Sequence, residues 1–85
     1  MSPDIITVTA NDDFTLTLEY ETGERRIFDA RPYMELGIFQ ELKDPAYFQR
    51  VGVSLGTIAW PHGQDFCPDT LFEKSVSCTP ATANQ

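Results

Sequence analysis

Residues 14–29 read FTLTLEYETGERRIFD, and this stretch decides the fold. Apolar and polar residues alternate from Phe14 to Tyr20, which is the period of a strand with one buried face and one face in water. Gly23 interrupts the alternation, and the apolar pair Ile27-Phe28 follows it. The stretch therefore predicts an antiparallel β-hairpin.

Two registers are open for this hairpin. A three-residue loop with Gly23 in a left-handed conformation pairs Leu16 with Phe28. A two-residue loop instead pairs Leu18 with Ile27. We favour the three-residue loop because it places Phe28 on the apolar face, whereas a slip of one residue turns every side chain to the opposite face.

Two other regions carry strand signals. Residues 5–9 are β-branched throughout, which predicts an N-terminal strand. Residues 51–54 and 57–60 flank Leu55-Gly56, and this pattern predicts a second hairpin. The Pro61-His62-Gly63-Gln64 segment that follows is expected to be a loop.

Helix signals are short and lie in the second half of the chain. Asp44 is suited to cap a helix over residues 45–50, with Pro45 at its first position. Pro68 opens a second helix over residues 68–74, acidic at its start and basic at its end, as the helix dipole favours.

Three stretches carry weaker signals. Residues 32–36 are typical of a single helical turn closed by Gly37. Residues 38–42 are apolar and predict either a short strand or irregular chain. Residues 75–85 contain no charge and almost no large apolar residue, so we expect one domain over 1–74 followed by a disordered tail.

Composition narrows the class of protein. Eighty-five residues suffice for one domain, and thirteen acidic against six basic residues give a net charge of −7. This charge repels phosphate backbones, so we expect no direct binding to nucleic acid and a basic protein as the better partner. No signal peptide or membrane span is evident, which predicts a cytoplasmic protein with Cys67 and Cys78 as free thiols.

The residues that invite a chemical reading cluster around the predicted loop. His62 with Asp65 and Asp69 offers a weak divalent-metal or acid–base set, yet each residue also suits a turn or a helix start. We favour the structural reading, and expect no cofactor, no metal and no catalytic residue. Trp60 is expected in the core, the alternative being a partly exposed contact for a partner. The candidate interaction surface is Trp60, His62, Asp65 and Asp69.

Other residues are assigned structural roles. Cys67 precedes the predicted Pro68 helix, and a buried small apolar residue or an inert cap is preferred over a reactive thiol. The turn, cap and helix-start positions are Gly23, Asp44, Pro45, Gly56, Pro61, Gly63 and Pro68.

The order of these pieces resembles a bacterial family of small proteins, domain of unknown function 2442. The matching residues are Phe14–Tyr20, Gly23-Glu24, Arg26–Asp29, Gly37–Phe39, Leu42–Asp44, Phe48, Gly56–Gly63, Asp65 and Pro68–Phe72. The resemblance covers residues 3–74 and implies an α+β fold of antiparallel strands with short helices. It implies no established activity, and partnership with small neighbouring proteins in toxin–antitoxin pairs. His62 stands where the family more often has Asn, which suits a turn.

Taken together, the residues and the resemblance predict an α+β domain: a small antiparallel sheet of two β-hairpins plus an N-terminal strand, with two or three short helices. The expected function is a non-enzymatic protein-interaction module, an antitoxin-like partner of a small neighbouring protein. The alternative is a small metal- or ligand-binding protein that uses the His62–Asp65–Asp69 loop. Exposed strand edges leave weak self-association open.

Overall fold

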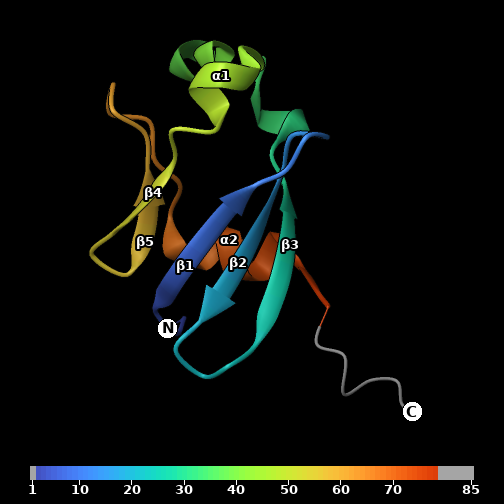
Figure 1. Cartoon of the computed structure of the whole chain (residues 1–85), viewed down its shortest axis with the longest axis vertical. Helices are drawn as coiled ribbons and strands as arrows, with labels where there is room; N and C mark the ends of the chain where they lie inside the picture. The colour runs from blue at the N-terminus through green and yellow to red at the C-terminus, as the bar shows by residue number, and fades with distance from the viewer. Residues whose placement is uncertain (1, 79–85) are drawn as a thin grey trace.

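The computed structural model describes residues 2–78, and the hairpin of residues 14–29 forms the two central strands of a four-stranded sheet (Figure 1). Its strands are β2 (Thr15–Tyr20) and β3 (Arg25–Asp29). Leu16 pairs with Phe28 and Gly23 has a φ of 90°, so the three-residue loop is confirmed. Every second residue of β2 is buried, as the alternation predicts.

Both hairpins belong to antiparallel sheets. The other strands are β1 (Ile5–Ala10), β4 (Gly52–Ser54), β5 (Thr57–Ala59) and β6 (Val76–Ser77). The main sheet has the order β1-β2-β3-β6, and β4 and β5 form a separate two-stranded sheet. This second hairpin lies beside the start of β1, where the Ile5 N–H donates to the Gly56 carbonyl at 2.9 Å. The predicted fold class is confirmed.

β6 lies within the tail that was expected to be disordered, and that prediction is wrong for its first residues. Val76 pairs with Ile27 of β3. Just before it, the Arg26 guanidinium donates from Nε to Ser75 Oγ at 2.6 Å and from Nη2 to the Ser75 carbonyl at 2.8 Å. Hydrogen bonds, rather than apolar burial, therefore order this segment. The rest of the predicted tail, residues 79–85, lies outside the described residues.

The second predicted helix has the expected bounds, α2 (Pro68–Lys74). Leu71 is fully buried, and the ring of Phe72 meets Tyr20 edge-on at a centroid distance of 5.4 Å. α2 therefore covers one face of the main sheet. In Figure 1 it lies behind the strands, and the face turned toward the viewer carries no helix.

The first predicted helix, α1 (Pro45–Phe48), starts where expected. The Asp44 side chain accepts a hydrogen bond from the Ala46 N–H at 3.0 Å, which caps the helix. The helix ends at Phe48, short of the predicted end at Arg50. Within residues 2–78, no helix has the length and apolar character that a membrane crossing requires.

Two 3₁₀ helices connect β3 to α1. The helical turn predicted over residues 32–36 is η1 (Arg31–Tyr33), which starts one residue earlier and ends three residues earlier than expected. Gly37, predicted to close this turn, is instead the first residue of the next 3₁₀ helix. The prediction for residues 38–42, a short strand or irregular chain, is wrong because they belong to η2 (Gly37–Lys43). Phe39 and Leu42 are spaced at the 3₁₀ repeat, so one helical face brings both into contact with the core.

The core lies between the inner face of the main sheet, α2 and the η2–α1 segment. Its buried apolar side chains are Ile5, Leu16, Leu18, Tyr20, Phe28, Ala30, Met34, Leu42, Tyr47, Phe48, Ile58, Trp60, Phe66 and Leu71. Phe66 contacts four other aromatic rings at centroid distances of 4.9–5.9 Å. Aromatic packing around this residue joins the two sheets, and it supplies much burial for a short chain.

Candidate functional site

Trp60, the most prominent residue of the predicted site, belongs to the core. Its side chain is 3% exposed, and its indole N–H donates to the Phe48 carbonyl at 2.9 Å. The indole also packs against the rings of Phe48 and Phe66. The core reading is confirmed. The assignment of Trp60 to an interaction surface is wrong, because neither its ring nor its polar group is available.

The loop after Trp60 is a tight turn, as predicted. The Gly63 N–H donates to the Trp60 carbonyl at 3.0 Å, and the Trp60 N–H donates to the Gln64 carbonyl at 2.9 Å. Gly63 has a φ of 100°, a conformation that a residue with a Cβ rarely adopts. The turn directs the Gln64 side chain inward, where it is 1% exposed.

Gln64 is the centre of a buried polar network that sequence reasoning missed. Its Nε2 donates to the Ile38 carbonyl at 3.0 Å and to Glu41 Oε1 at 2.8 Å. Its Oε1 accepts from the Tyr47 hydroxyl at 2.6 Å. The amide therefore ties the loop to both η2 and α1. The bonded residues are 17 to 26 positions apart in the sequence, so no local pattern predicts these contacts.

His62 joins the same network from the surface. Its Nδ1 lies 2.6 Å from Glu41 Oε2, and its ring stacks on Tyr47 at a centroid distance of 5.0 Å. The His62 backbone N–H also donates to the Tyr47 hydroxyl at 2.9 Å. Both oxygens of Glu41 are thus engaged, one by Gln64 and one by His62. The chemical effect of the arrangement is to fix the turn against η2 and α1.

The two acidic residues of the predicted site lie elsewhere. The backbone of Asp65 bridges to Ala59, while Asp69 stands in the first turn of α2 and accepts a hydrogen bond from the Ser2 hydroxyl at 2.7 Å. Among residues 2–78, no three His, Cys, Asp or Glu side chains are arranged to hold a metal ion. The structure therefore contradicts a metal site formed by His62, Asp65 and Asp69.

Cys67 occupies the N-cap position of α2 and its side chain caps nothing. The thiol is exposed and makes no capping hydrogen bond, so the expectation of a buried residue or a side-chain cap is wrong. Its neighbour Phe66 takes the buried position instead. Cys78 is exposed as well, and both thiols are free.

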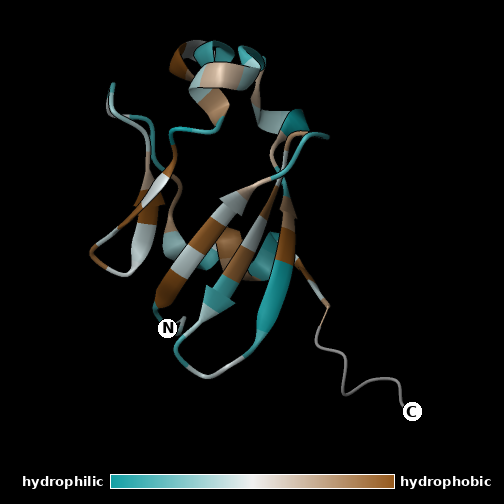
Figure 2. Cartoon of the chain, in the orientation of Figure 1, coloured by the Kyte–Doolittle hydropathy of each residue, from teal (hydrophilic) through white to brown (hydrophobic). Residues whose placement is uncertain are grey.

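The open face of the main sheet carries a shallow hollow of about 210 Å³. Its lining is polar and comes from three neighbouring strands: Thr7, Thr9, Thr17, Glu19 and Arg25. The Thr7 hydroxyl donates to the Glu19 carboxylate at 3.1 Å. In Figure 2 hydrophobic (brown) residues alternate with near-neutral (white) or hydrophilic (teal) ones along β1 and β2, and the less hydrophobic set lines the hollow.

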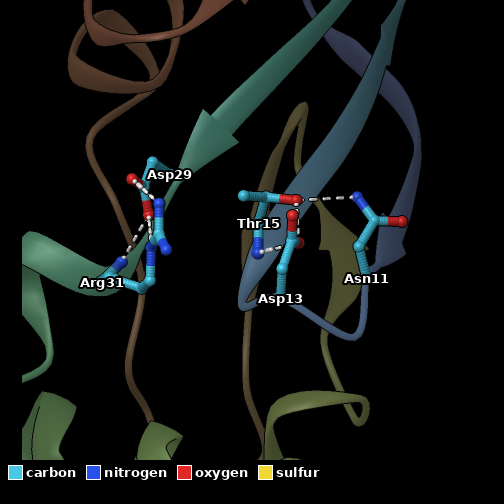
Figure 3. A network of polar contacts seen from close by, with 5 residues as sticks. All are labelled: Asn11, Asp13, Thr15, Asp29 and Arg31. Carbon is cyan, nitrogen blue, oxygen red and sulfur yellow. Dashed lines mark hydrogen bonds and ion pairs between the residues drawn. The ribbon is translucent and has the colours of Figure 1, made fainter.

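A second polar group lies at the end of the same sheet (Figure 3). The Thr15 hydroxyl donates to Asp13 at 2.6 Å, and Asn11 Nδ2 donates to the Thr15 hydroxyl at 3.0 Å. Arg31 binds Asp29 through Nε and Nη2, both at 2.9 Å. The bond from Thr15 lowers the pKa of Asp13, and the bonds from Arg31 lower the pKa of Asp29. These contacts fix the β1–β2 turn and the junction of β3 with η1.

One buried polar atom has no partner among the described residues, the hydroxyl oxygen of Tyr20. Tyr20 is 1% exposed, and burial raises the pKa of its phenol group. The hydroxyl therefore carries a desolvation cost that no hydrogen bond offsets.

Comparison with known proteins identifies one protein family that matches this chain. No curated protein and no solved structure matches this chain. A family model described as Protein of unknown function (DUF2442) matches residues 5–77, from the first residue of β1 to the last residue of β6. The match includes both hairpins, the buried Trp60 and the turn that follows it. Because it spans nearly all of the described structure, the chain belongs to the DUF2442 family.

Proposed function

We propose that this chain is a non-enzymatic protein-interaction module that binds a small basic protein, as the antitoxin-like half of a pair. The proposal rests on the acidic side chains that form no ion pair within residues 2–78. Of the thirteen acidic residues, all within residues 2–78, four lie in ion pairs with a basic side chain or His62, which leaves nine. The four are Glu24, Asp29, Glu35 and Glu41.

This surplus favours one class of partner. A surface with a net charge of −7 attracts a basic protein and speeds its encounter, while it repels nucleic acids and anionic lipid surfaces. The open face of the main sheet adds hydroxyl, carboxylate and guanidinium groups that suit a polar contact. We assign the module no direct role on nucleic acid or membranes.

The polar network around Gln64 supports a role without catalysis. Glu41 has both oxygens engaged, and the Tyr47 hydroxyl both donates and accepts. His62 likewise uses Nδ1 on the Glu41 carboxylate and its backbone N–H on the Tyr47 hydroxyl. We therefore propose that His62 serves to hold the turn.

Co-expression tests the proposal. The tagged chain is produced together with each protein encoded by a flanking gene, and complexes are measured by calorimetry at about 0.05 M and about 0.5 M salt. We expect one small basic protein to co-purify with the chain, with an affinity that falls steeply with salt because charge steers the contact. If no flanking product binds, or if binding ignores salt, the proposal is wrong.

A further inference from the structure

We infer that Leu55, at the tip of the β4–β5 hairpin, is the apolar contact by which this module enters a pocket of its basic protein partner; the inference rests on the function proposed above. The side chain of Leu55 is 101% exposed, so it touches nothing in its own chain. In Figure 2 this turn is hydrophobic (brown) on the side that leaves β4 and near-neutral (white) on the side that enters β5. A large apolar side chain held entirely in water contributes nothing to the core.

The backbone at Leu55 is also unfavourable. Its φ is 52°, and Gly56 follows at 81°, which is the pattern of a two-residue hairpin turn with both residues left-handed. Asn is the usual residue at the first of these positions, because its side chain tolerates the conformation. A leucine there combines backbone strain with full exposure.

Phe14 provides the internal comparison. Among the described residues, only Phe14 and Leu55 are non-glycine residues with positive φ. The ring of Phe14 packs edge-on against Phe48 at a centroid distance of 5.3 Å, so core packing offsets its strain. Leu55 has no such contact within the chain. Backbone strain at Leu55 that no contact within the chain offsets points to a contact with another molecule.

The tip is held in a fixed place. The Gly56 carbonyl accepts a hydrogen bond from the Ile5 N–H at 2.9 Å. The Asp4 side chain packs closely on Gly56, since a Cβ at that glycine would lie 2.7 Å from Asp4 Oδ1. Because both contacts tie the tip to the start of β1, Leu55 loses little freedom on binding, which favours affinity.

The surroundings of Leu55 indicate the chemistry of the partner. Two further apolar side chains on the neighbouring strands β4 and β1, Val53 and Ile6, are 42% and 53% exposed. The Asp4 carboxylate borders the tip, and the Asp4 backbone N–H donates to the Glu21 carboxylate at 3.1 Å. Neither carboxylate is in an ion pair within residues 2–78.

These neighbours select a heterologous partner. An apolar pocket with a rim of Lys or Arg complements an apolar tip bordered by carboxylates. A second copy of this chain brings the same carboxylates and the same net charge of −7, so the charges oppose self-association through this tip. The occupant is therefore a basic protein with an apolar pocket.

The test replaces Leu55 with the residue that its turn prefers. For Leu55→Asn we expect the affinity for the co-purified basic flanking product to fall about 30-fold, the value of burying one leucine side chain. The melting temperature of the free chain is expected to rise by about 4 °C, because strain is relieved. Leu55→Gly, which adopts the turn freely, gives the same loss of affinity by an independent route.

Leu36→Asn is the matched control. Leu36 is 56% exposed and has an ordinary extended backbone, with a φ of −97°, so the same change of side chain leaves affinity unaltered. If the wild type binds and both Leu55 variants bind equally well, the inference is wrong while the proposed function stands. If the wild type binds no flanking product, the proposed function itself fails. A concentration-dependent dimer that Leu55→Asn abolishes identifies a second copy as the occupant and overturns the basic partner.

Discussion

Gln64→Met tests how far the buried polar network sustains the fold. Methionine has nearly the length of glutamine and keeps the packing of the buried site, but it can make none of the three hydrogen bonds of the amide. The substitution leaves the Tyr47 hydroxyl, the Ile38 carbonyl and one Glu41 oxygen without their partner. The turn then loses its tie to η2 and α1.

The magnitude follows from these three contacts. Each of the two neutral hydrogen bonds is worth about 1 kcal/mol, and the bond to the Glu41 carboxylate about 2 kcal/mol. We therefore expect the free energy of unfolding to fall by about 4 kcal/mol. For 85 residues the total is of the order of 4–13 kcal/mol, so the substitution is expected to remove between about a third and all of the stability.

Urea denaturation, followed by the fluorescence of the single tryptophan, measures the change. Trp60 is buried in the core and reports global unfolding. Gln49→Met is the control: Gln49 is exposed and follows α1, so its replacement is expected to change stability by less than about 0.5 kcal/mol. A loss below about 1 kcal/mol for Gln64→Met would refute the reasoning.

Three other variants extend the test to separate parts of the fold. Tyr20→Phe removes the buried hydroxyl that lacks a partner and keeps the ring contact with Phe72. Urea denaturation should therefore show equal stability or a gain of up to about 1 kcal/mol. A clear loss of stability would reveal a partner for the hydroxyl. Asp44→Ala removes the cap of α1 and is expected to cost about 1 kcal/mol, whereas Asp12→Ala, at an exposed turn position, should cost nothing measurable. The pKa of Asp29 is lowered by Arg31, so its contribution to stability is present above the ordinary pKa of 3.8 and is lost as pH falls below it through the lowered value. Urea midpoints measured across this range should fall less steeply for Asp29→Asn than for the wild type, and parallel curves would contradict the assignment.

The elements that sequence predicts well are those with local causes. The register of the first hairpin follows from the alternation along β2 and from the one conformation that Gly23 supplies most easily. The starts of α1 and α2 follow from Asp44-Pro45 and Pro68, whose capping chemistry acts within a single turn. Each of these signals lies within a few residues of its effect.

The failures depend on contacts between distant segments. β6 forms because Arg26 holds Ser75, a contact across 49 residues that no property of the tail itself reveals. Gln64 is one residue of a polar turn in the sequence, and its burial requires Tyr47 and Glu41 to be in place. The turn after Trp60 is therefore predictable from its own residues, whereas its contacts are not, since the Glu41 partner of His62 lies 21 residues away.

The attachment of β6 also determines how the molecule bears a mechanical load. Arg26 donates two hydrogen bonds to Ser75 and forms an ion pair with Glu24 through Nη1. Its guanidinium carbon also lies 4.4 Å from the centroid of the Phe72 ring. Three residues after Ser75, the Cys78 N–H donates to the Arg25 carbonyl, at the looped end of the hairpin. A pull applied after Cys78 and directed away from the sheet therefore breaks the β3–β6 bonds one at a time and meets its firmest resistance at a single arginine.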